Sequence, residues 1–180
     1  ILLGILWKIK LDPILFGELL GLILGIGCIC LTYLIGKEIF NENIALLSAF
    51  FLAFSPTFLF HSSTILTGIP STFFALLSIH FLIKKNYFLT GLSVGLSFMT
   101  RFLQLFILIP ILLAVFLHRK KQLKNMLNLA YGFLIITVPY LILNTFLYKD
   151  PIYPFVLQVF MSKYTGWVFH QPFNYYFINL

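Results

Sequence analysis

Long apolar runs separated by short polar loops make up most of the chain. The first run covers residues 14–36, with Glu18 near its start, and the polar loop KEIFNEN follows it. A helix of about 20 apolar residues crosses the ~30 Å hydrocarbon core of a membrane. This run therefore predicts one membrane-spanning helix.

The second apolar run, residues 44–83, is too long for one membrane helix. At 1.5 Å per residue it would extend for about 60 Å, roughly twice the thickness of the hydrocarbon core. The natural break is HSSTILTGIP, because Pro70 suits the first turn of a helix. Hydroxyl groups that can cap the two helix ends belong to Ser62, Ser63, Thr64 and Thr67.

The third run, residues 88–117, would extend for about 45 Å as one helix. Basic residues flank it on both sides, and a single crossing would put the two basic clusters on opposite faces, against the positive-inside tendency. Two crossings with a turn at Arg101 are therefore predicted. The leg before the turn, residues 88–100, would be only ~20 Å long. Its end should lie below the membrane surface, where Arg101 would line a cavity.

The rest of the chain predicts one more membrane crossing and two interfacial segments, one of which is at its start. Residues 129–148 predict a helix with a kink at Pro139, which emerges at KDPIYPF. The aromatic stretch 153–173 and the opening ILLGILWKIKLDP are typical of segments that lie in the outer membrane interface. Because the sequence starts at Ile1 and FNYYFINL resembles an interrupted helix, residues 1–180 are expected to be part of one larger transmembrane domain.

Together these elements predict an all-α, polytopic transmembrane bundle with about six spans and interfacial helices on the outer face. The basic residues expected on the cytoplasmic face are Lys37, Lys84, Lys85, Arg119, Lys120, Lys121 and Lys124. Those expected on the opposite face are Lys8, Lys10, Arg101, Lys149 and Lys163.

Composition agrees with a membrane protein and narrows the possible partners. The chain is 61% hydrophobic and 9% charged, whereas a soluble domain has roughly 25% charged residues. Its net charge of +7 comes from basic residues in short loops. These residues orient the chain in the membrane and do not indicate binding of nucleic acid. Cys28 and Cys30 point to different helix faces, so they are interpreted as packing residues.

Four stretches, in this order, resemble a known family. They are YLIGKEIFNENIALLSAFFLAFSP, HSSTILTGIPSTFF, GLSVGLSFMTRF and LILNTFLYKDPIYPF. They are similar to the membrane glycosyltransferases of the GT-C class, in the group that contains protein mannosyltransferases and lipid A aminoarabinose transferases. The third stretch resembles the family's small-residue helix that ends in Thr-Lys or Thr-Arg, at Arg101.

The resemblance implies a multi-pass enzyme of a prokaryotic cell membrane. Such enzymes move a sugar from a polyprenyl-phosphate carrier to a protein, lipid or glycan acceptor on the extracytoplasmic side. The family's catalytic acid lies in a first outer loop that this sequence does not include, so no catalytic residue is assigned. Many members also carry an acid just before the descending helix, where this sequence has Gly68.

Arg101 is the leading candidate for binding substrate. An arginine presents several donors to a phosphate, and the resemblance to the Thr-Lys position indicates the same role. Two structural alternatives stay open: the side chain could snorkel to the interface, or it could form an ion pair with Glu18.

The other candidates carry weaker signals. His61 could donate a hydrogen bond to a sugar or phosphate, or it could only occupy a helix end. Asp150 could accept a hydrogen bond from a sugar hydroxyl or help bind a divalent cation, although an Asp-Pro pair also commonly starts a turn. Tyr153 belongs to the aromatic-proline stretch of the resemblance. Tyr164 and His170 are candidate acceptor contacts. No metal site and no firm cofactor is assigned.

Two other classes of protein remain as alternatives. Broken helices also line the substrate paths of transporters, which often contain two related halves, and this sequence shows no internal repeat. A non-catalytic membrane subunit would share the same helices but lack the acid in the outer loop.

Overall fold

The computed structural model describes residues 12–64, 66–117 and 122–164, which fold into helices with no strand among them. The predicted all-α membrane-type fold is confirmed. The chain divides into two compact units, Ile1–Thr137 and Val138–Leu180.

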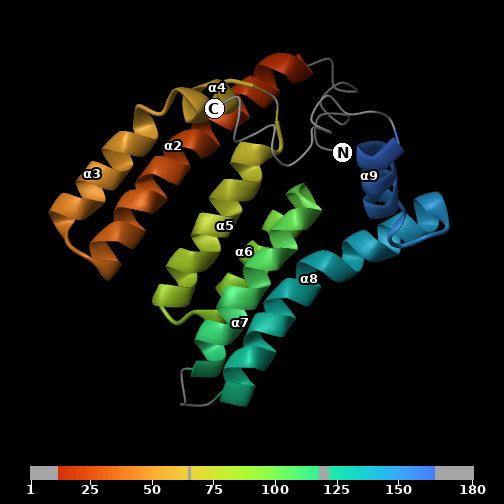
Figure 1. Ribbon diagram of the computed structural model, residues 1–180. Coiled ribbons are helices and arrows are strands. Elements are labelled where there is room, and N and C mark those ends of the chain that lie inside the picture. Colours follow the sequence, from red (N-terminus) through yellow and green to blue (C-terminus); the bar gives the residue numbers. More distant parts are fainter. Residues whose placement is uncertain (1–11, 65, 118–121, 165–180) are drawn as a thin grey trace. The chain divides into compact units, whose positions relative to one another are not determined.

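Helix α2 (Pro13–Ile39) and helix α3 (Glu42–Ala53) form an antiparallel pair at the start of the first unit (Figure 1). The Asp12 carboxylate begins α2 by accepting a hydrogen bond of 2.9 Å from the Ile14 amide. The Asn41 side chain begins α3 in the same way, with a bond of 2.9 Å from the Ile44 amide. The helix predicted over residues 14–36 is confirmed.

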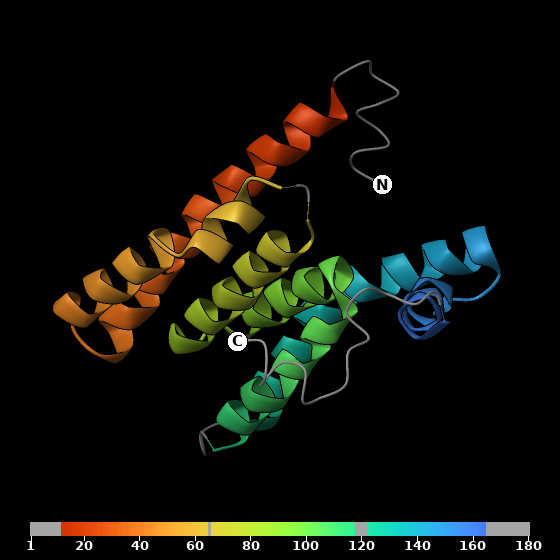
Figure 2. The ribbon, with the colours of Figure 1, turned by 45° about the horizontal axis from the view of Figure 1, so that its top comes forward.

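Helix α4 (Pro56–Ser62) follows a break at Ser-Pro, which run length and charge did not predict but at which the resemblance has a helix end. It is bent by 65° from α3. The residue before a proline avoids helical geometry, and Ser55 accordingly adopts an extended conformation and caps α4. Figure 2 shows α4 lying against α2 after this bend.

A break within the predicted residues 61–70 is confirmed, since α4 ends at Ser62 and helix α5 (Gly68–Ile83) begins at Gly68. The predicted capping is only partly right. Thr67 precedes α5 but its side chain makes no capping hydrogen bond. The hydroxyls of Ser63 and Thr64 instead donate to carbonyl oxygens in the last turn of α4. A hydroxyl at a helix end can satisfy either set of unpaired backbone groups, and here the carbonyls are closer in sequence.

Helix α6 (Tyr87–Thr100) ends at the turn predicted from charge. Arg101 has extended backbone angles, and a 3-10 helix, η1 (Phe102–Ile107), then leads into helix α7 (Leu108–Leu117). Helices α5 and α6 lie side by side in Figure 1 and share a seam of small polar residues. The buried members of this seam are Ser71, Ser78, Thr90, Ser93 and Ser97. Small residues at such a seam let membrane helices approach closely.

Helix α8 (Gln122–Tyr148) begins earlier than the predicted residue 129 and contains Pro139, whose kink stays a prediction. Its first part packs on α6 with the two backbones in contact. A Cβ atom built at Gly91 would lie 1.9 Å from the Leu129 carbonyl oxygen, and one at Gly132 would lie 2.1 Å from the Phe88 carbonyl oxygen. Only glycine fits at these two positions without moving a backbone.

The core of the first unit lies where α6, α7 and the start of α8 meet. Its buried members are Val94, Ile111, Val115 and Leu129. Five half-buried side chains pack against them, namely Leu82, Tyr87, Ile107, Leu108 and Phe133. Through Tyr87 and Val94, this core holds the first half of α6 in place.

The second unit is a helix–turn–helix that ends in α9 (Tyr153–Tyr164). Lys149 adopts a positive φ of 60° in the turn. The side-chain amide of Asn144 donates a hydrogen bond of 3.1 Å to the Pro151 carbonyl, and the rings of Tyr148 and Tyr153 stack with their centroids 5.1 Å apart. The interfacial segment predicted over 153–173 is helical as far as residue 164, and its later part lies outside the described residues, as do residues 1–11 of the opening segment.

Two described helices are long and apolar enough to cross a membrane, Ile14–Ile39 and Gln122–Tyr148, and the bent pair α3–α4 makes a third candidate. The chain itself buries only 28% and 17% of the two long spans. Such large uncovered apolar surfaces are typical of helices that face lipid. The shorter helices α5 and α6 contain 16 and 14 residues, so the number of six spans stays a prediction.

Two ion pairs join helix ends on the side away from Arg101. Lys84 pairs with Glu38 at the end of α2, and Lys37 pairs with Glu42 at the start of α3, with 3.2 Å between the charged atoms of the second pair. Lys37 and Lys84, both predicted to be cytoplasmic, therefore lie at the same end of the bundle. Of the other predicted topology markers, Lys8, Lys10 and residues 119–121 lie outside the described residues.

The predicted topology can be tested by labelling. In a background in which Cys28 and Cys30 are replaced by alanine, we expect Lys84→Cys and Lys124→Cys to react with an impermeant maleimide from one side of the membrane. Arg101→Cys and Asp150→Cys should react from the other side. Labelling of positions 84 and 124 from opposite sides would show that residues 88–117 cross only once.

Candidate functional site

Arg101 lines a pocket of about 340 Å³ at one end of the first unit. The walls come from α4 and the residue before it, the first two turns of α5 and Arg101, which follows α6. The lining residues are Ser55, Thr57, Phe58, His61, Gly68, Ile69, Thr72 and Arg101. Two breaks in the helices, at Ser55 and at Arg101, bring these residues together.

Local backbone geometry fixes the start of the Arg101 side chain. The Arg101 amide donates to the Ser97 carbonyl at 3.0 Å, and the Arg101 carbonyl accepts from the Gln104 amide at 2.9 Å. The backbone of Arg101 itself is extended, with φ −153° and ψ 111°. This conformation lets the side chain leave the helix axis and reach the pocket, where it is exposed.

No described carboxylate of the first unit forms an ion pair with Arg101. The acidic residues of that unit are Asp12, Glu18, Glu38 and Glu42. The alternative of a Glu18–Arg101 ion pair is therefore not what the structure contains. A guanidinium group with no internal carboxylate partner is free to bind an external anion, in particular a phosphate.

His61 reaches the same pocket from α4. Its ring is half-buried and meets the ring of Phe60 edge-on, with the centroids 5.6 Å apart. Helix α4 is held against α2 by the buried Ser62. A Cβ atom built at Gly21 would lie 2.7 Å from the Ser62 carbonyl oxygen, so the two backbones nearly touch. This close contact positions His61 on the pocket wall.

Three hydroxyl groups and two apolar side chains complete the lining. Thr57 and Thr72 were not predicted from the sequence as site residues. The signal that could have placed Thr57 is the Ser-Pro pair just before it, which marks the start of a new helix. Hydroxyl, imidazole and guanidinium groups together can donate hydrogen bonds to phosphate oxygens and to sugar hydroxyls.

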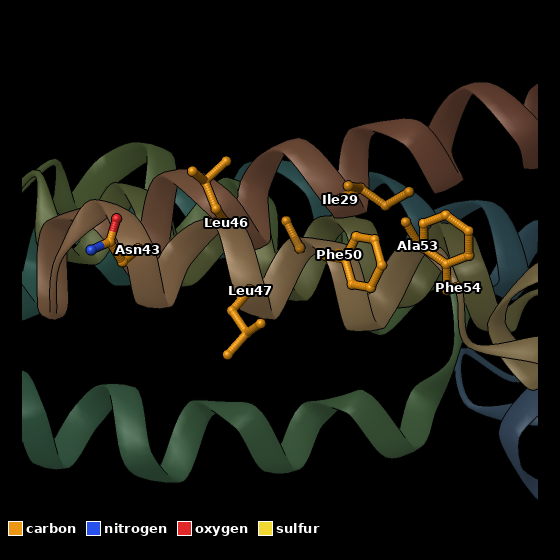
Figure 3. A pocket seen from close by; sticks show the side chains of 8 residues that line it. Ile29, Asn43, Leu46, Leu47, Phe50, Ala53 and Phe54 are labelled. Atoms are coloured by element: carbon orange, nitrogen blue, oxygen red, sulfur yellow. The ribbon is translucent and has the colours of Figure 1, made fainter.

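A larger pocket of about 550 Å³ runs along α2 and α3 but carries no charged group. Figure 3 shows its side chains, which are apolar except for Asn43. The rings of Phe50 and Phe54 close one part of it, with their centroids 4.5 Å apart. An apolar groove on the outside of a membrane helix pair fits a lipid chain and offers no chemistry for a phosphate. The candidate site is therefore the smaller pocket at Arg101.

Asp150 and Tyr153 lie together in the second unit, where each has a structural contact. The Asp150 carboxylate accepts a bond of 2.9 Å from the Ile152 amide, which is the turn-starting role weighed from the sequence. Tyr153 stacks on Tyr148. Tyr164 is the last residue of α9, and His170 lies outside the described residues. Within the described part of the chain, no three His, Cys, Asp or Glu residues gather as metal ligands would.

The fold and a family comparison place this chain among the membrane glycosyltransferases. Residues 2–143 match the family described as dolichyl-phosphate-mannose-protein mannosyltransferase, and the chain belongs to that family. The matched stretch contains every residue of the Arg101 pocket. The resemblance to GT-C enzymes inferred from the sequence is thereby confirmed. Comparison with curated proteins and with solved structures returns no match.

Proposed function

We propose that this glycosyltransferase moves a sugar from a polyprenyl-phosphate carrier to a protein, lipid or glycan acceptor on the extracytoplasmic side of the membrane. The observation that carries the proposal is the Arg101 guanidinium, which shares a pocket with His61 and three hydroxyls and has no ion pair with the described carboxylates of its unit. The family description, which names a lipid-phosphate sugar, supports the same class of donor.

The proposed reaction needs a cation at the site where phosphate leaves. The bond between the anomeric carbon of the sugar and the phosphate oxygen breaks through an oxocarbenium-like state, and the bonding electrons go to that oxygen. Arg101 stabilises the negative charge that develops there, and His61 donates a second hydrogen bond to the phosphate or to the sugar. A carboxylate removes the proton from the acceptor hydroxyl or amine, and that base is not assigned to a residue of this chain.

The arrangement of charges supports the proposed side of the membrane. Arg101 ends α6, whereas Lys84 and Lys85 stand just before its start. Lysines in short loops favour the cytoplasmic face, which leaves the Arg101 end of α6 for the opposite face. Asp150 is also proposed as a contact to a sugar hydroxyl or to a divalent cation, and Tyr153 as a contact to substrate.

The donor class can be tested with the purified full-length protein in lipid vesicles. We expect a labelled sugar to be transferred from a polyprenyl-phosphate sugar, with release of the polyprenyl phosphate, and no transfer from the matching nucleotide sugar. Direct use of the nucleotide sugar would contradict the proposal. Movement of the sugar lipid across the vesicle membrane without transfer would support the transporter alternative. A parallel reaction with a chelator tests the metal requirement.

A further inference from the structure

A second cationic pocket lies at the opposite end of α6 from Arg101. It has a volume of about 210 Å³ and is formed by the end of α5, the α5–α6 turn, the first residue of α6 and one residue of α7. The lining residues are Leu82, Ile83, Lys85, Tyr87 and Ala114. Neither the sequence patterns nor the proposed glycosyl transfer gives this pocket a role.

Lys85 occupies a backbone position that favours glycine. Its φ is 57°, in the left-handed region. Its amide donates to the Leu82 carbonyl at 2.9 Å, and the next amide, that of Asn86, donates to the Phe81 carbonyl at 2.9 Å. These two bonds form a Schellman motif at the end of α5, and glycine is the usual residue at the position that Lys85 occupies. Few residues other than glycine adopt this conformation, and Lys149 is the other described residue that does so.

The charge of Lys85 is not balanced by a described carboxylate of its unit. Glu38 pairs with the neighbouring Lys84, and Glu42 pairs with Lys37. Asp12 caps the start of α2, and Glu18 forms no ion pair among the described residues. Lys85 therefore differs from Lys84 beside it, and its ammonium group needs an external anion or water.

We propose that this pocket binds the phosphate of an anionic membrane phospholipid. Basic pockets between membrane helices are suited to such headgroups, and Lys85 supplies the cation. Tyr87, which also packs on the core, has the amphipathic ring that suits the headgroup level. Leu82, Ile83 and Ala114 give an apolar wall for the start of an acyl chain. The volume is below the roughly 300–1,000 Å³ of sites that enclose a drug-sized molecule, which favours a headgroup.

The test uses two glycine variants that relieve the same backbone strain. Lys85→Gly removes the pocket cation, whereas Lys149→Gly removes a lysine with a φ of 60° that lines none of the three pockets described above. Native mass spectrometry of the full chain would measure binding of phosphatidylglycerol and of phosphatidylcholine with the same acyl chains. We expect Lys85→Gly to weaken phosphatidylglycerol binding by about fivefold, the effect of one lysine near an anionic surface. Phosphatidylcholine binding should not change.

The control variant shows whether the anionic lipid binds at a specific site or through general electrostatic attraction to the protein. Lys149→Gly is expected to bind both lipids as the unaltered protein does. Equal losses in the two variants, or no loss in Lys85→Gly, would overturn the proposal. Displacement of the lipid by inorganic phosphate at the same concentration would also overturn it, because the site would then recognise free phosphate. Unfolding of Lys85→Gly is not expected, since glycine suits this backbone.

Discussion

Replacing Arg101 by glutamine is expected to lower turnover of the lipid-linked sugar by about 10²–10³-fold, the usual effect of removing one donor to a developing negative charge. The glutamine keeps a polar side chain but brings no positive charge to the leaving phosphate. Turnover would be measured in membranes with saturating acceptor, so that the chemical step is followed. Normal turnover by a folded Arg101→Gln protein would exclude Arg101 as the phosphate ligand.

Three further variants separate a substrate contact from a structural arginine. Arg101→Lys keeps the charge but loses the two-pronged geometry of the guanidinium, so it should retain part of the activity. Thr72→Val removes a hydroxyl from the same pocket and should have a smaller effect. Glu18→Gln should not rescue Arg101→Gln, because the two side chains form no ion pair. Restored thermal stability in that double variant would instead indicate a structural pair.

The second large effect is expected at the contact between α6 and α8. Gly132→Ala would place a Cβ atom 2.1 Å from the Phe88 carbonyl oxygen and 2.8 Å from the Leu92 amide nitrogen. Neither backbone atom can rotate away, so the helices must separate and the core beside them must repack. Overpacking of this kind costs about 1–3 kcal/mol. The loss should appear even though alanine favours a helix by up to about 1 kcal/mol over glycine.

The matched control for this variant is Gly68→Ala. A Cβ atom built at Gly68 meets no atom within 4 Å, so the same chemical change should leave the free energy of unfolding nearly unchanged. Both variants would be compared by thermal or denaturant unfolding in the same detergent. If Gly132→Ala were as stable as the unaltered protein, the backbone contact between α6 and α8 would not exist in solution.

The main breaks in the fold could be predicted because length and charge determine them. A run of residues 44–83 cannot cross a ~30 Å layer once, and basic residues on both sides of residues 88–117 require an even number of crossings. These two arguments located the breaks before α5 and at Arg101. Length and charge did not locate the break at Ser55, because the apolar run continues through it; only the resemblance, in which a helix ends in Ser-Pro, indicated it.

The site could be predicted only in part. Arg101 was noticeable because it is a lone charge in an apolar run, and His61 because it precedes a predicted break. Thr57 and Thr72 carry no such signal, since hydroxyl residues are common throughout membrane helices. They belong to the pocket because α4 bends by 65° and meets the first turn of α5. That approach depends on packing between distant residues, such as Ser62 against Gly21, which periodicity does not encode.

Gly68 makes the Arg101 pocket easy to alter in evolution or by design. The position begins α5, lines the pocket and has room for a side chain. An aspartate or glutamate there would need no backbone movement, and its negative charge would oppose the binding of phosphate in the same pocket. Changing this one residue to an acid would therefore weaken anion binding in the pocket, and the reverse change would restore it. The pocket is in this sense one mutation away from a different ligand preference.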